Sequence, residues 1–186
     1  MLTRTLILAS VALITLAAPV RGGDWAIPAA TQKDYAANLA VAVTAGLLTP
    51  GSSTGSGMVG GVELSFNDPL IQLPYGRLRD SVGYSHAKHG GLQIDSFEFN
   101  VHYLVPLVGD ALWVGFGPGF GWVITDSDAG PSPNLWAGQI GADITYISGN
   151  ALIGFDSRWQ WTESDRVGNA VGADNWKNVI KIGWTY

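Results

Sequence analysis

Charged side chains recur at alternate positions of several segments in this sequence, and this spacing could build a polar interior. In a β-strand, alternate residues face the same side, so these side chains would meet if the strands enclose a space. An unpaired buried ion costs several kcal/mol, and we therefore expect opposite charges to pair. The residues expected in this cluster are Glu63, Arg79, Glu98, His102, Asp143, Asp156, Arg158 and Lys181.

Such a cluster allows two interpretations. It could be a static core of ion pairs that fills the interior, or it could act as a gate or a proton-accessible site. Both need the same residue types at the same spacing, because buried charges persist only when they are paired and hydrogen-bonded. We favour the static core of ion pairs.

The histidines do not form a recognisable catalytic or metal site. A nucleophilic hydroxyl must lie beside its base, but Ser85 and His86 are neighbours, and neighbours on a strand point to opposite faces. His86 and His89 without further ligands make a poor metal site. We therefore expect no catalytic residue, no metal and no cofactor, and we expect His86 and His89 to be solvated.

A series of glycines at positions 115, 117, 119 and 121 alternates with bulky residues. A phosphate-binding glycine loop would require a strand followed directly by a helix, and no helical pattern follows here. The glycines are better explained as interior positions that leave room for long ionic side chains opposite them.

The elements that position these residues have the period of two that is typical of β-strands. In residues 153–162, for example, Ile153 and Phe155 alternate with Gly154 and Asp156, and near the end Lys177 shares the parity of Lys181. Eight segments alternate in this way: 38–44, 62–66, 79–85, 96–105, 112–124, 136–146, 153–162 and 177–186.

The connections between these segments predict two unlike ends. Residues 48–57, 87–91, 126–134 and 163–175 are polar and read as long loops, whereas 106–110 and 148–150 read as tight turns. This asymmetry is typical of outer-membrane barrels. Residues 67–76 are longer than a tight turn should be, and Pro118 predicts a bulge or kink inside its strand because proline lacks a ladder donor.

Composition limits the class of protein. Arg4, an apolar run from Leu6 to Ala18 and small residues up to Gly22 predict a cleaved export signal over residues 1–22. We expect an N-terminal extension over 23–34 and one barrel domain over 35–186. Without Arg4 and Arg21 the chain has 8 Lys+Arg against 15 Asp+Glu, which argues against nucleic acid as a partner. The absence of cysteine excludes disulfides and thiolate metal sites.

The two alternating sets of residues in each strand, one polar and one apolar, indicate which face meets lipid. A soluble barrel points its apolar parity inward and has a charged outer face, but here the polar parity is mostly small and the other is bulky and nearly uncharged. Small side chains suit the narrow interior of an eight-stranded barrel. The expected aromatic girdles, where rings meet the membrane interface, comprise Tyr84, Trp122, Trp136, Trp159, Trp161 and Trp176 at one rim and Phe66, Tyr103, Tyr146, Trp184 and Tyr186 at the other.

The end of the chain and its central hairpin carry a family resemblance. Ile180, Ile182, Trp184 and Tyr186 resemble the C-terminal assembly signal of bacterial outer-membrane barrels, with Tyr in place of the commoner terminal Phe. Residues 99–122, FNVHYLVPLVGDALWVGFGPGFGW, resemble the central hairpin of the small OmpA/OmpX/OmpW-like barrel superfamily.

The resemblance implies a Gram-negative outer-membrane protein in contact with outer-membrane lipids and lipopolysaccharide. It also implies insertion by the barrel-assembly machinery through the C-terminal strand. It implies no particular activity, and we expect a monomer.

Three functions stay open. We favour a structural or loop-mediated interaction role with a lumen plugged by side chains. The alternative is an OmpW-like narrow channel or conduit for small or hydrophobic solutes, against which the inward charges count. A lipid A-modifying enzyme is less favoured, because none of the histidines has the His-x-Ser pattern of the PagL-like deacylases.

Overall fold

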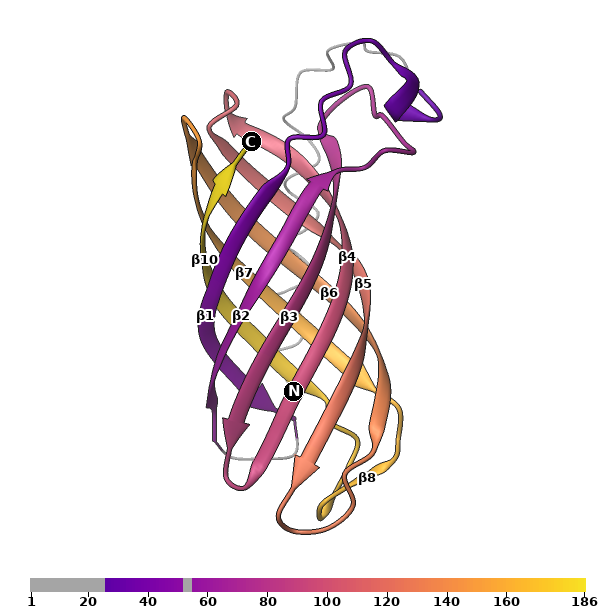
Figure 1. Cartoon of the computed structure of the whole chain (residues 1–186), viewed down its shortest axis with the longest axis vertical. Coiled ribbons are helices and arrows are strands. Elements are labelled where there is room, and N and C mark those ends of the chain that lie inside the picture. The colour runs from indigo at the N-terminus through magenta and orange to yellow at the C-terminus, as the bar shows by residue number, and fades with distance from the viewer. Residues whose placement is uncertain (1–25, 52–54) are drawn as a thin grey trace, which may run out of the picture.

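The chain forms a closed antiparallel barrel of eight long strands, as the alternation predicts. The computed structural model describes residues 26–51 and 55–186 (Figure 1), so the expected export signal over 1–22 lies outside the described residues. Neighbouring strands follow the order β1-β10-β7-β6-β5-β4-β3-β2. The barrel strands are β1 (Ala40–Pro50), β2 (Gly57–Asn67), β3 (Arg77–His89), β4 (Leu92–Val108), β5 (Leu112–Ser127), β6 (Asn134–Ser148), β7 (Ala151–Thr162) and β10 (Asn175–Thr185).

The first and last strands close the barrel. β1 pairs with β10 along its length, with Val41 opposite Trp184 and Val43 opposite Ile182. Closure gives every strand two neighbours, which removes the unpaired backbone edge that an open sheet would expose. The first strand begins at Ala40, within the alternating segment 38–44. No helix in the described part of the chain is long and apolar enough to cross a membrane.

Each strand separates an outward apolar face from an inward polar or small face. On β6, Ile140 is 56% exposed, whereas its neighbour Gln139 is 1% exposed. The same contrast holds on β10, where Ile180 and Ile182 are exposed and Lys181 is buried. The period of two therefore places the charged residues inside the barrel, as expected from the sequence.

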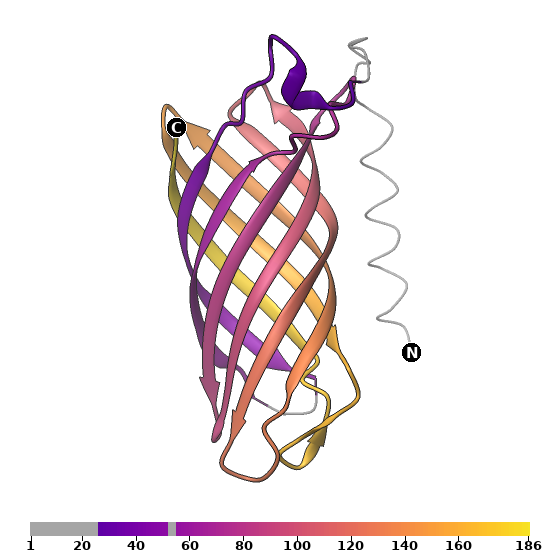
Figure 2. The same cartoon turned by 45° about the vertical axis from the view of Figure 1, so that its right-hand side comes forward.

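The N-terminal segment lies at one mouth of the barrel, which we call the extension end (Figure 2). Its short 3-10 turn η2 (Ala29–Thr31) packs beside the connection between β2 and β3, with the backbone N–H groups of Ala29 and Ala30 donating to the carbonyls of Leu70 and Pro69. The Tyr35 hydroxyl donates to the carbonyl of Asn67 at 2.8 Å. This pairing explains why residues 67–76 are too long for a tight turn.

Two acidic side chains, Asp68 and Asp80, act on the Tyr35 phenol. Burial, and then the charges of Asp68 and Asp80, raise the pKa of the Tyr35 phenol. The phenol therefore stays protonated and keeps its hydrogen bond to Asn67 over the ordinary pH range.

The opposite mouth, which we call the loop end, differs from the sequence-based expectation in two places. Residues 87–91 do not form a long loop, because β3 extends to His89 and only Gly90 and Gly91 connect it to β4. Both glycines have positive φ (57° and 79°), which favours glycine over other residues. Residues 163–175 are not only a polar loop, since they contain the paired strands β8 (Arg166–Val167) and β9 (Ala170–Val171).

The loop that carries β8 and β9 contributes to an apolar layer inside the loop end. Val167 and Ala173 are buried there, and the Gly168 N–H donates to the carbonyl of Pro131. The layer consists of Leu48, Val59, Ala87, Ile94, Val123, Leu135, Ala137, Val167, Ala173 and Val179, with Leu92 packed against it. Apolar side chains therefore predominate inside the loop end, whereas the charged side chains lie in the middle of the lumen and toward its extension end.

Pro118 does not produce the expected bulge. Asn100 pairs with Gly119 and Tyr103 pairs with Phe116, so the register between β4 and β5 is the same on both sides of the proline. The missing N–H interrupts the ladder without shifting it. The register shift lies instead between Pro106 and Val108, next to the turn at the extension end.

Candidate functional site

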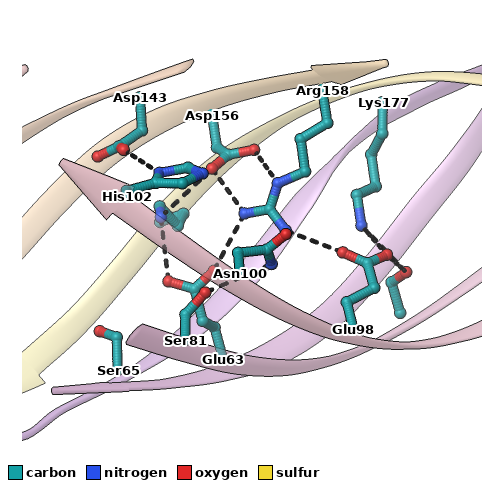
Figure 3. Close-up of polar contacts among 12 residues, drawn as sticks. Glu63, Ser65, Ser81, Glu98, Asn100, His102, Asp143, Asp156, Arg158 and Lys177 are labelled. Carbon is teal, nitrogen blue, oxygen red and sulfur yellow. Dashed lines mark hydrogen bonds and ion pairs between the residues drawn. The ribbon is translucent and has the colours of Figure 1, made fainter. Parts of the chain in front are cut away.

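The candidate site is the barrel lumen, where charged side chains from four strands meet (Figure 3). We use the name ionic cluster for its three carboxylates and three cations. Glu63 comes from β2, Glu98 from β4, Asp156 and Arg158 from β7, and Lys177 and Lys181 from β10. All six side chains are at most 11% exposed.

Arg158 is the centre of the ionic cluster. Its Nε and Nη2 donate to the two oxygens of Asp156 at 2.8 and 2.7 Å, and its Nη1 donates to Glu98 Oε2 at 2.9 Å. Its Nη2 also lies 3.5 Å from Glu63 Oε2. The guanidinium fork suits this role because its planar donors match carboxylate oxygens in pairs. One side chain thus links β7 to β2 and β4 across the lumen.

Two lysines complete the charge balance. Lys177 Nζ donates to Glu98, and Lys181 Nζ lies 3.0 Å from Glu63 and 3.6 Å from Asp156. Lys177 is not among the residues that the sequence predicts for this cluster. The signal that identifies it is its position, because Lys177 and Lys181 face the same side of the strand. The cluster contains three negative and three positive side chains, which is what burial in a narrow interior requires.

A chain of side-chain amides lies beside the ionic cluster toward the loop end. Asn175 donates to Gln160 at 2.8 Å, Gln160 to Gln139 at 3.4 Å and Gln139 to Asn100 at 2.5 Å. All four residues are buried. These four residues are uncharged, so a search for charged side chains does not find them in the sequence. Their inward positions on their strands would identify them.

His102 and Asp143 form a separate pair toward the extension end. His102 Nδ1 lies 2.6 Å from Asp143 Oδ1, and the Thr145 hydroxyl donates to the other carboxylate oxygen at 3.0 Å. The Nε2 atom of His102 is buried and has no hydrogen-bond partner among the described residues. No serine hydroxyl contacts this nitrogen, so the pair lacks the nucleophile that a hydrolytic triad needs.

The lumen offers one group of possible metal ligands. Ligand atoms of His102, Asp143 and Asp156 lie within 4.8 Å of one another. Arg158 already occupies both oxygens of Asp156, and Lys181 lies 3.6 Å from one of them. A bound cation would have to displace these positive groups, so the donor set fits a metal poorly.

Arg79 does not join the ion pairs, contrary to the expectation from sequence. Its Nε donates to Ser65 Oγ at 3.2 Å and its Nη2 to the Ser65 carbonyl at 3.4 Å. It lines a partly open cavity on the extension-end side of the ionic cluster. Arg77, the preceding inward residue of β3, lines the same cavity, together with Trp113, His102 and Asp143.

The inward glycines make room for the polar side chains, as the alternation predicts. A Cβ added at Gly141 would lie 2.7 Å from Arg158 Cγ, and one at Gly119 would lie 2.0 Å from Asn100 Oδ1. A Cβ at Gly115 would lie 2.4 Å from Asp143 Oδ1. The lumen therefore has no space for larger residues at these positions.

The expected aromatic residues lie on the outward face. Trp122 and Trp136 are in edge contact with ring centroids 4.5 Å apart, and Trp159 lies 5.9 Å from Trp176 toward the same loop end. At the extension end, Tyr103 is in edge contact with Phe116. The exposed members include Tyr84, Trp136, Tyr146, Trp161, Trp176, Trp184 and Tyr186.

The serine and histidine next to each other on β3 point to opposite faces. Ser85 is buried in the lumen near Glu98 and Lys177, whereas His86 lies on the outside and pairs with Asp95 at 2.8 Å. They cannot act as a nucleophile and its base.

Solved structures with similar folds are small outer-membrane barrels. Neisserial surface protein A is 15% identical with a TM-score of 0.56, and the match covers 79% of this chain and 95% of that one. The N-terminal β-barrel domain of Pseudomonas aeruginosa OprF is 13% identical with a TM-score of 0.51 and matches 79% and 97% of the two chains.

A further match, the outer membrane enzyme PagL, has 20% identity and covers 77% of this chain and 97% of that one, but its TM-score of 0.48 is too low to bear on activity. No protein-family profile and no curated protein sequence matches this chain. At these identities the likeness concerns the fold alone, which is a closed antiparallel barrel of eight strands.

Proposed function

We propose that this protein is an integral outer-membrane barrel whose lumen is closed by side chains and whose role is structural or mediated by its loops. The outward face supports membrane insertion, because its exposed residues are apolar along whole strands, as on β6 and β10. The similarity to solved outer-membrane barrels supports the same location. Outer-membrane lipids and lipopolysaccharide would then surround a monomer.

The observation that carries the closed lumen is the set of contacts made by Arg158. This residue bonds carboxylates from β4 and β7 and lies near one from β2, so it bridges the interior in the plane of the ionic cluster. The apolar layer at the loop end adds a second barrier. Ions crossing the barrel would have to pass both layers, of which the first is held by charge-assisted hydrogen bonds.

The direct test of the closed lumen is electrical. We expect the refolded protein in planar lipid bilayers to give no steady conductance, because the ion pairs of Arg158 bridge the lumen in the proposed closed state. Arg158→Ala removes the central bridge and should introduce openings, whereas Arg166→Ala in the exposed loop should not. Substantial conductance of the unsubstituted protein would favour the narrow-channel alternative and contradict the closed lumen.

Membrane insertion has its own test. A closed barrel resists detergent unfolding, so the unboiled protein should migrate differently from the boiled protein on a denaturing gel. Fractionation of a Gram-negative host should recover it with the outer membrane, and deletion of the last strand from residue 175 should abolish this by removing the segment that the assembly machinery would engage. Recovery of the full-length chain in the soluble fraction would contradict the proposed location.

A non-catalytic role is part of the proposal. The His102 and Asp143 pair has no adjacent nucleophile, and Ser85 and His86 lie on opposite faces. Mass spectrometry of lipid A from cells with and without the protein should find the same acyl pattern. A change that depends on His102 would contradict this part of the proposal.

A further inference from the structure

The extension-end half of the lumen contains two arginines that no carboxylate neutralises by contact. Arg77 and Arg79 both line the cavity on that side of the ionic cluster. Among the described residues, no carboxylate oxygen lies within 4.0 Å of either guanidinium. Asp110 and Asp143 act on Arg77 only through space. The other lumen arginine, Arg158, lies within 4.0 Å of three carboxylates.

The hydrogen-bond donors of these two arginines are only partly used. Arg79 donates two hydrogen bonds to Ser65. Arg77 Nε is buried without a hydrogen-bond partner, while its Cζ atom lies 3.9 Å from the ring centroid of Trp113. The stacking on Trp113 orients the Arg77 fork, and a buried donor without a partner is costly. The cavity therefore presents oriented N–H groups that nothing in the described chain accepts.

The carboxylates around the cavity act on the two arginines only from a distance: Asp110 and Asp143 on Arg77, and Glu63 and Asp143 on Arg79. The ionic cluster is balanced in itself, and Asp143 is already bonded to His102 and Thr145. Arg77 and Arg79 are two residues apart on β3, so their Cα atoms are separated by about 6.6 Å and both side chains face inward. Two like charges at this spacing in a partly enclosed space repel each other, and an anion between them would remove the repulsion.

We propose that this cavity binds a small oxyanion such as phosphate, held between the guanidinium groups of Arg77 and Arg79. Planar guanidinium forks match the oxygens of phosphate groups in pairs, and lining residues at the barrel's extension end make that mouth the route of entry. The site goes beyond the closed-lumen role, because a barrel sealed by the ionic cluster can hold an anion on one side of the seal.

The test uses the refolded protein in micelles of a maltoside detergent, which contains no phosphate. Inorganic phosphate is titrated in at constant ionic strength while the Nε–H signals of the arginines are followed by nuclear magnetic resonance. We expect saturable shifts of the Arg77 and Arg79 signals and only a small, linear response of Arg166, which lies in the exposed β8 hairpin.

Variants separate the site from a general effect of charge. Arg77→Gln or Arg79→Gln should each weaken phosphate binding about tenfold or more, because each removes charge-assisted hydrogen bonds. Arg166→Gln is the matched control and should leave binding unchanged. Arg79→Lys keeps the charge without the fork and should weaken binding less than Arg79→Gln. Gel migration of the unboiled variants verifies that each has folded.

The source of the phosphate group is decided by a second arm. If free phosphate gives no saturable shift but vesicles containing phosphatidylglycerol do, with the same dependence on Arg77 and Arg79, the ligand is a lipid headgroup at the extension end. A saturable response to neither probe, or an equal loss of response in Arg166→Gln, would overturn the proposal. None of these outcomes depends on conductance. The proposal of an anion site and the proposal of a closed lumen are therefore tested separately.

Discussion

The two halves of the lumen differ in whether their buried arginines form ion pairs. Toward the middle, Arg158 lies within 4.0 Å of three carboxylates, and the cluster around it is electrically balanced. Toward the extension end, Arg77 and Arg79 line a cavity and have no carboxylate in contact among the described residues. The strands of both halves are the same, so the difference arises from which inward side chains meet at each level.

An inward charge does not by itself predict an ion pair. Arg79 and Arg158 have the same side chain and the same inward orientation, yet only Arg158 sits at the level where Glu98 and Asp156 lie. A side chain in a barrel is restricted to partners at its own height, because the strands tilt and their register fixes which residues face each other.

The largest expected effect tests this difference directly. Arg158→Met leaves three buried carboxylates without their central cation, and breaking a buried ion pair from one side costs about 3 to 5 kcal/mol. Arg79→Met breaks no ion pair and removes only the hydrogen bonds to Ser65, so it should cost about 1 to 2 kcal/mol. Urea unfolding of the two variants refolded into lipid vesicles measures both. Equal losses would remove the contrast between the halves.

The next effect examines a single carboxylate of the ionic cluster. Glu98→Gln retains the shape but weakens the bonds from Lys177 and Arg158, and we expect a loss of about 1.5 to 3 kcal/mol in unfolding free energy. Asp34→Asn in the exposed extension removes the same charge and should have no measurable effect. An Asp34→Asn variant as unstable as Glu98→Gln would indicate a response to net charge instead of a local bond.

Packing provides a third contrast. Ala137→Val adds volume to the tight apolar layer at the loop end and should cost about 1 to 3 kcal/mol by overpacking. Ala42→Val adds the same volume beside the cavity and should change stability by less than about 1 kcal/mol. Thermal unfolding of both variants followed by circular dichroism tests this. If Ala42→Val is the more damaging, the extension-end half is as filled as the loop-end half.

The smallest expected effect concerns the only hydrogen-bond partner that Arg79 has in the described chain. Ser65→Ala removes the hydroxyl that accepts from Arg79 Nε but keeps the backbone carbonyl, so we expect a loss of about 0.5 to 1.5 kcal/mol. Ser157→Ala, which removes a hydroxyl from β7 that donates to Asn178, is a control of similar size. A loss as large as that of Arg158→Met would mean that Ser65 anchors a network like the ionic cluster.

Several features were predictable from the sequence by itself. The period of two determined which side chains face inward, and it identified eight strands and the inward location of Glu63, Glu98, Asp156 and Arg158. The physical reason is local: successive residues of a strand point to opposite faces whatever the strand pairs with. The same rule would have added Lys177 and Arg77.

Other features were decided only by the tertiary structure. The height at which each inward residue lies depends on strand register and tilt, and these place Arg158 among carboxylates and leave Arg79 with Ser65. The return of residues 163–174 over the loop end, and the packing of residues 26–39 against the connection between β2 and β3, join segments far apart in the chain. Pairing partners of this kind are set by closure of the whole barrel, which no single stretch of alternating residues encodes.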